Sequence, residues 1–127
     1  MIALQVQVNN DQPIIAGGSD LGGLNAGISA VGTLGKESKG AVYVKDKVNI
    51  DIFVGGLTQH REKLNEHLRW IKHQKLKCGD EIVIKIIETD QADEPMSREI
   101  EDVEKTKKIR EEFLKKYGKG ISNAREE

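Results

Sequence analysis

Glycine is concentrated in one short part of the chain, and this concentration restricts the fold more than any other feature of the sequence. Seven of the thirteen glycines among the 127 residues lie in residues 17–36, GGSDLGGLNAGISAVGTLGK. A glycine inside a helix costs up to about 1 kcal/mol relative to alanine, so these glycines disfavour a helix. Apolar residues also alternate with small or polar ones over 24–34, which favours a strand there, with loops on both sides. A helical spacing of apolar residues leaves a helix over 20–34 as the alternative: Leu21, Leu24, Ile28 and Val31.

The same glycines do not fit the two common phosphate-binding patterns. In the dinucleotide fingerprint the first glycine is followed by another two residues later, and no glycine of residues 17–35 has such a neighbour. The P-loop pattern needs a glycine where the chain has Ala30 and a hydroxyl where it has Glu37. We therefore assign these glycines to the fold and predict no bound cofactor.

Further segments alternate as strands do. Residues 2–8 and 13–17 are expected to form a hairpin, because the residues between them are typical of turns. In residues 41–54 the alternation is broken near Asp46, which suggests two strands joined by a short turn. Residues 82–88 follow a Gly-Asp turn and are largely apolar on both faces, so we expect this strand in the middle of a sheet.

Two segments have helical periodicity. Residues 58–70, TQHREKLNEHLRW, are expected to form a short helix because apolar residues recur at spacings of seven, four and three: Leu57, Leu64, Leu68 and Ile71. A second, charged helix is expected to begin with Ser97 as its N-cap and to end at Gly118. Pairs of glutamate and lysine four residues apart support this second helix.

These elements indicate a mainly β (α+β) fold. We expect an antiparallel β-sandwich or barrel-like body of about five to six strands, with one short helix and a charged C-terminal helix. Residues 1–95 would form the β-rich domain, residues 96–118 a C-terminal helix packed on it or extending from it, and residues 119–127 a flexible tail.

Charge and composition argue against several classes of protein. The formal net charge of −1 gives no global field that would attract nucleic acid or an anionic membrane. The first ten residues, MIALQVQVNN, lack the basic leader and apolar core of a signal peptide, and no apolar run approaches the ~18 residues of a membrane-spanning helix. The single cysteine, Cys78, cannot form an internal disulfide. We therefore expect a reduced, cytoplasmic protein without a membrane partner.

Residues 60–77 carry the strongest local charge, with six Lys or Arg residues against two acidic ones and Trp70 in their midst. The stretch could contact an acidic protein surface, or it could be a solvated face with Trp70 in the core. One tryptophan is not the repeated aromatic platform of nucleic-acid-binding sheets, which argues against nucleic acid. The candidate partner-binding residues are Arg61, Lys63, Arg69, Trp70, Lys72 and Lys75.

The candidate metal ligands are the three histidines of the chain, His60, His67 and His73. On a helix, His60 and His67 would be two turns apart, about 10 Å along the axis, and the i, i+4 pairing of zinc enzymes is absent. The alternative is surface histidines within a basic stretch. A metal site would need oxygen donors from a distant segment, for which the candidates are Asp90, Asp93 and Glu94.

Three stretches resemble a family of short uncharacterised bacterial proteins: VGGL at 54–57, EHLRW at 66–70 and LKCGDEIVIKIIETDQADEP at 76–95. The family pattern contains V-G-G-L, H-L-R-W and L-x-x-G-D-E-[IV] with an acidic tail, and the likeness covers most of residues 1–95. In this family the stretch that matches LNAGISAVG is β-branched, which implies a strand, and the helix after Pro95 is an addition. The family has no established activity, so the resemblance implies no catalytic residues.

The chain shows no set of nucleophile, base and orienting residue, so we predict that it is not an enzyme. Its small size and mixed charge favour a protein-binding or accessory module, such as an immunity-type protein. One alternative is a homo-oligomeric structural module that assembles through edge strands or the C-terminal helix. The other is a metal-binding protein that uses the histidines.

Overall fold

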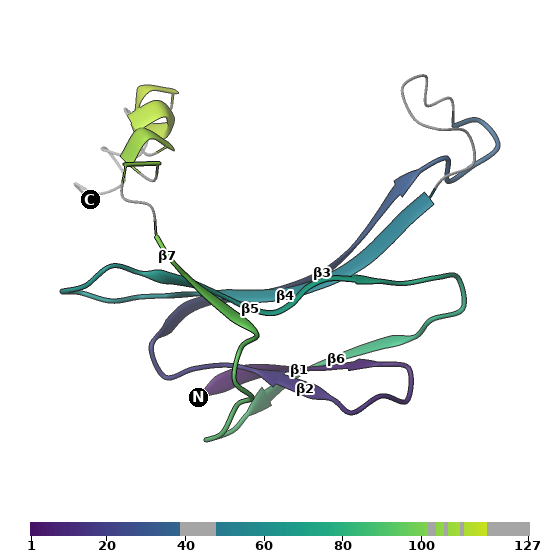
Figure 1. The fold of residues 1–127 in the computed structure, drawn as a ribbon, viewed down its shortest axis with the longest axis horizontal. Coiled ribbons are helices and arrows are strands. Elements are labelled where there is room, and N and C mark those ends of the chain that lie inside the picture. The colour runs from purple at the N-terminus through teal and green to yellow at the C-terminus, as the bar shows by residue number, and fades with distance from the viewer. Residues whose placement is uncertain (39–47, 102–103, 106, 110, 117–127) are drawn as a thin grey trace, which may run out of the picture.

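The computed structural model describes residues 1–38, 48–101, 104–105, 107–109 and 111–116 (Figure 1). Within these residues the strands are β1 (Ile2–Val8), β2 (Ile14–Ala16), β3 (Leu21–Gly32), β4 (Val48–Thr58), β5 (Glu66–Lys75), β6 (Ile82–Glu88) and β7 (Ser97–Ile100). The described residues between 104 and 116 are helical. The prediction of a mainly β fold is confirmed.

The strands form two antiparallel sheets. The smaller sheet has the order β2-β1-β6, and the larger sheet has the order β3-β4-β5-β7. The two sheets lie one above the other, and the hairpin of β3 and β4 extends beyond the smaller sheet (Figure 1). The fold is therefore a small antiparallel sandwich, which is one of the two arrangements that the sequence left open.

The hydrophobic core lies between the two sheets. On β4 the even-numbered Ile52 and Val54 are fully buried, whereas the intervening Phe53 is half-buried on the other face. Removing these apolar side chains from water stabilises the fold by roughly 25 cal/mol per Å². The buried core residues are Val6, Val8, Ala16, Ile52, Val54, Leu68, Trp70 and Ile71.

The glycine-rich segment is a strand, which confirms the prediction over 24–34. Strand β3 begins earlier, at Leu21, so the glycines at 22–23 lie inside the strand and not in the loop that was predicted to precede it. The pairing with β4 is irregular at this point. At Gly27 an added Cβ would collide with the ring of Phe53 on β4, so the ring would have to shift to admit any side chain at this position.

The helix predicted over residues 58–70 is wrong. Residues 59–65 form a loop, and the residues after it form strand β5, which pairs with β4. Leu68 and Trp70, two residues apart, are both buried, as expected for one face of a strand. The helical spacing was misleading because its residues lie on β4, in the loop and on β5, so they do not share one face.

The prediction that residues 82–88 lie in the middle of a sheet is also wrong. Strand β6 pairs with β1 along one side and is the edge of the smaller sheet. After β6 the chain leaves this sheet, and the next strand, β7, joins the other one. The apolar residues of β6 are therefore largely exposed rather than covered, and Ile86 is 79% exposed.

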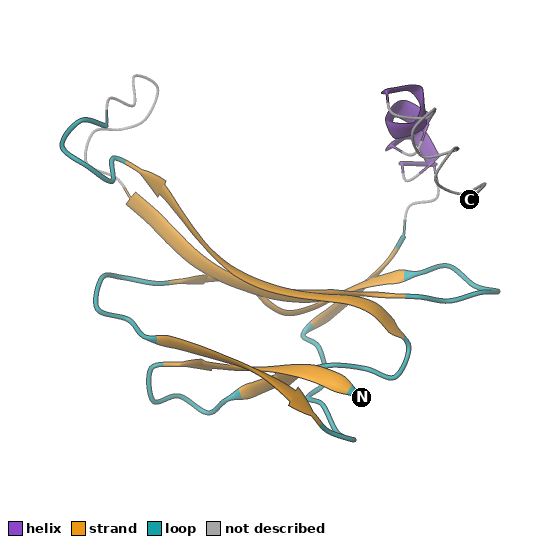
Figure 2. Cartoon of the chain, turned by 180° about the vertical axis from the view of Figure 1, so that it is seen from behind, coloured by secondary structure: helices purple, strands orange, loops and turns teal. Residues whose placement is uncertain are grey.

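The C-terminal helix begins later than predicted. Ser97, expected to be its N-cap, instead begins β7, which pairs with β5, and the helical residues start at 104. The helix lies apart from both sheets (Figure 2), and its described apolar residues Ile109 and Phe113 are exposed. The first of the two strands predicted within 41–54, the turn near Asp46 and the flexible tail lie outside the described residues.

Candidate functional site

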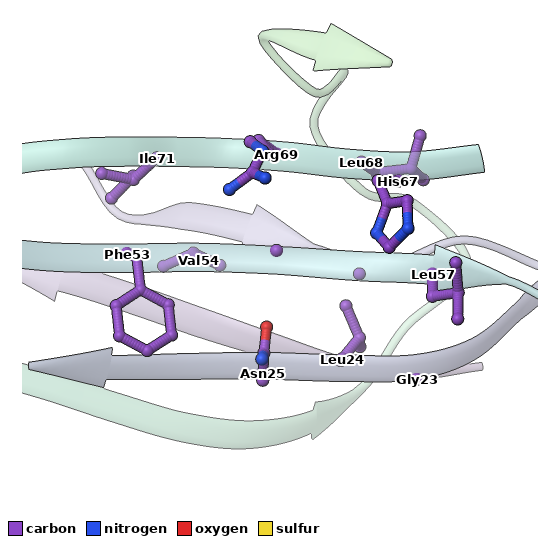
Figure 3. A pocket seen from close by; sticks show the side chains of 12 residues that line it. Gly23, Leu24, Asn25, Phe53, Val54, Leu57, His67, Leu68, Arg69 and Ile71 are labelled. Atoms are coloured by element: carbon purple, nitrogen blue, oxygen red, sulfur yellow. The ribbon is translucent and has the colours of Figure 1, made fainter. Parts of the chain in front are cut away.

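A shallow groove lies on the face of the larger sheet that is turned away from the smaller sheet (Figure 3). Its volume is about 450 Å³, and strands β3, β4 and β5 contribute to it. Because the core uses the other face of this sheet, the side chains in the groove are free to contact a ligand. The side chains that it presents are Asn25, Phe53, Leu57, His67 and Arg69, and the buried core residue Ile71 borders it.

Glycines form the floor of the groove. Gly55 lies between Phe53 and Leu57 on β4, and these two side chains stand at opposite ends of the groove (Figure 3). A Cβ at Gly55 would lie 3.1 Å from the carbonyl oxygen of Leu68, so neighbouring backbone is close there. At Gly23 a Cβ would meet no atom within 4 Å. The groove is therefore open because these positions carry no side chain.

Arg69 gives the groove a positive charge. Arg69 and His67 come from β5, and Asn25 comes from β3 (Figure 3). No acidic side chain lines the groove, and the ion pairs found among the described residues do not involve Arg69. On β7, Ser97 lies opposite Arg69 and Glu99 lies opposite His67. Arg69 is thus available to pair with a negative group of a ligand.

The six candidate partner-binding residues do not form one surface. Arg69 lies in the groove, whereas Trp70 is only 5% exposed and belongs to the core. This position of Trp70 agrees with the second interpretation of the basic stretch, a solvated face with Trp70 in the core. The indole N–H of Trp70 donates a hydrogen bond to the carbonyl oxygen of Asp93, at 2.7 Å. The remaining four are exposed, two in the loop before β5 and two on β5 itself: Arg61, Lys63, Lys72 and Lys75.

The three histidines occupy different environments. His60 lies in the loop after β4, with its Nε2 atom 2.7 Å from Oδ2 of Asp20. His67 lines the groove, and His73 is exposed further along β5. In the part of the chain that the structure describes, no three His, Cys, Asp or Glu side chains gather in a way that could hold a metal ion. The suggested oxygen donor Asp93 instead accepts a hydrogen bond from the backbone N–H of Ile15.

Sequence analysis missed most of the groove. Asn25, Phe53 and Gly55 were not singled out as parts of a surface, and Leu57 was assigned to the apolar spacing of the wrongly predicted helix. The groove could have been predicted from the small or polar residues at the odd positions of β3, because such residues leave a sheet face open. Arg69 was found through its charge, although it was placed on a helix.

Comparisons of the chain with protein-family models, with curated proteins and with solved structures found no match. The resemblance to short bacterial proteins therefore stays a prediction. Within the described residues, no helix is long and apolar enough to cross a membrane. The arguments about function that follow depend on the geometry of this chain alone.

Proposed function

We propose that this protein is a non-enzymatic protein-binding module, which uses the groove of the larger sheet to bind an acidic segment of a partner protein. The observation that carries the proposal is Arg69, which lies in an open groove without a carboxylate at ion-pair distance among the described residues. Hydrogen bonds between guanidinium and carboxylate are strong and directional. An accessory or immunity-type role is one setting for such binding.

The shape of the groove favours an extended segment over a compact small molecule. The groove is shallow and has a floor of backbone and glycine between Phe53 and Leu57. A peptide could place apolar side chains against these two residues while an acidic side chain reaches Arg69.

Nucleic acid is the less favoured ligand for this face. Trp70, the aromatic residue within the basic stretch, is buried and hydrogen-bonded in the core, so it cannot stack on a base. The formal net charge of the chain is −1, which provides little of the electrostatic attraction on which nucleic-acid binding depends.

Peptide selection on the full chain tests the proposal. Peptides displayed on phage are selected against the wild-type protein, and their affinities are then measured for the wild type and for Arg69→Gln. We expect the selected peptides to contain Asp or Glu and to bind Arg69→Gln about ten to a hundred times more weakly, because a hydrogen bond to a charged group contributes roughly 1.5–3 kcal/mol. Lys36→Gln, an exposed change in the loop after β3, is the matched control and should leave affinity unchanged.

A second variant tests the groove itself rather than its charge. Gly23→Val adds a side chain in open space, so it should fill part of the groove without a clash and leave the free energy of unfolding nearly unchanged. We expect the selected peptides to lose affinity for this variant as well. Selected peptides that lack acidic residues, or that bind both groove variants as tightly as the wild type, would refute the proposed function.

A further inference from the structure

Strand β6 forms an open edge of the smaller sheet and carries little of the usual protection of edge strands, with Lys85 as the one charge in its middle. It is seven residues long, contains no proline, and pairs with β1 in unbroken register. Natural edge strands are commonly shortened, bulged or charged, which prevents pairing with another chain. Here Lys85 is the single charged residue before the terminal Glu88.

The backbone groups on the open side of β6 can be assigned from its pairing with β1. The N–H of Asn9 donates to the carbonyl oxygen of Glu81 at 2.7 Å, and the N–H of Thr89 donates to that of Met1 at 3.0 Å. In an antiparallel pair the direction of these groups alternates along the strand. Odd-numbered residues of β6 therefore bond to β1, and even-numbered residues direct their N–H and C=O groups to the open edge.

The even-numbered residues of β6 also carry an exposed apolar row. Ile82 packs partly against the core, Ile84 is 42% exposed and Ile86 is 79% exposed. On β1, Ile2 is on the same face of the sheet and is 69% exposed. The open edge thus combines backbone groups that have no hydrogen-bonding partner on β1 with isoleucine side chains that are exposed to water.

We propose that β6 pairs with β6 of a second copy of this chain, in antiparallel orientation about a twofold axis. The smaller sheets of the two copies then form one continuous sheet with the order β2-β1-β6-β6-β1-β2. The two copies present the same strand, and a twofold axis makes such a contact self-complementary.

The proposed register is centred on Ile84 of each copy. With Ile84 of each copy opposite Ile84 of the other, Ile82 faces Ile86 and Lys85 faces Val83, so isoleucine meets isoleucine along the contact. A shift that places Lys85 opposite its own counterpart is disfavoured, because like charges directly opposite one another destabilise a sheet. A shift toward the end of the strand places Ile84 opposite Glu88. The apolar row and the position of the lysine thus favour a second copy as the occupant of this edge.

The oligomeric state of the full chain tests the proposal. Light scattering after size-exclusion chromatography should give the mass of a dimer for the wild type. Ile86→Lys should raise the dimer dissociation constant by about tenfold or more, because it places a charge among isoleucines. Circular dichroism of this variant should match that of the wild type, which would show that the fold is kept. Leu34→Lys, which removes another exposed apolar residue far from β6, is the matched control and should remain dimeric.

Disulfide crosslinking tests the register independently of Ile86. Residues 83 and 85 of opposite copies would form a non-hydrogen-bonded pair, with Cα atoms about 4.5 Å apart, which is within reach of a disulfide. With Cys78→Ser as the background, a mixture of Val83→Cys and Lys85→Cys chains should oxidise to a linked dimer more readily than either variant alone. A monomeric wild type, a dimer unaffected by Ile86→Lys, or efficient crosslinking of Lys85→Cys alone would overturn the proposal. Because β6 is not part of the sheet that carries the groove, a result that refutes the dimer would not refute the proposed function.

Discussion

The Nε2 atom of His60 lies 2.7 Å from Oδ2 of Asp20, and this contact joins the loop after β4 to the turn before β3. The Nδ1 atom of the same ring lies 3.0 Å from the carbonyl oxygen of Leu64. Both partners are acceptors, so both ring nitrogens can donate only when the ring is protonated. The hydrogen bond to Asp20, followed by that to Leu64, raises the pKa of His60, and the same bond to His60 lowers the pKa of Asp20.

This pair makes the stability of the protein depend on pH. Because the pKa of His60 is raised on folding, its contribution is complete below the unfolded pKa of about 6.5 and is lost as pH rises through the folded pKa. The contribution of Asp20 is complete above about pH 4 and is lost as pH falls through its lowered pKa. We expect the difference in unfolding free energy between wild type and His60→Gln, measured in urea, to be largest in mildly acidic solution. Asp20→Asn should lower the pKa of His60 in an NMR titration, and an unchanged titration would contradict this account.

Thr58 is a buried polar residue whose hydroxyl has a defined role. Its Oγ1 atom accepts a hydrogen bond from the backbone N–H of Glu66 at 2.8 Å, which fixes the start of β5 against the end of β4. Thr58→Val should cost about 1–3 kcal/mol in the free energy of unfolding, because it leaves that N–H without its partner. Thr58→Ser keeps the hydroxyl and should cost less in the same urea titration. Equal losses in the two variants would show that the methyl group matters more than the hydrogen bond.

Gly27 and Phe53 should be energetically coupled across β3 and β4. An added Cβ at Gly27 would overlap the ring of Phe53, so Gly27→Ala should destabilise the fold by about 1–3 kcal/mol, as overpacking does. In a Phe53→Ala background the space is free, and the same change should cost much less. Thermal or urea unfolding of the four proteins in this double-mutant cycle measures the coupling. Additive effects would contradict the proposed contact.

Trp70 is the single tryptophan of the chain, so its fluorescence reports on the core. It is 5% exposed, and we expect emission typical of a buried indole in the native protein, with a shift to longer wavelength on unfolding. Trp70→Phe keeps most of the apolar ring but removes the hydrogen bond to Asp93, so we expect a loss of about 1–3 kcal/mol. Emission typical of an exposed indole in the folded protein would contradict the position of Trp70 between the sheets.

Much of the fold could be predicted where apolar residues alternate strictly. The hairpin of β1 and β2 and the strand in the glycine-rich segment followed from period two and from the cost of glycine in a helix. The leucines around residues 57–71 misled the prediction because spacings of seven and four fit a helix even when a loop interrupts them. Two register shifts between β4 and β5 further disturb the alternation there, so that the consecutive Trp70 and Ile71 are both buried.

By itself, the sequence determined the local conformation of most strands and the antiparallel, mainly β class, because backbone sterics and the period of side chains act between near neighbours. The tertiary structure alone decided which strands became edges and which face of the larger sheet stayed open. Strand β6 has the composition of a central strand and yet lies at an edge, since pairing depends on where the chain goes afterwards. For the same reason Arg69 and Asn25, 44 positions apart in the sequence, meet in one groove only because β3 and β5 both flank β4.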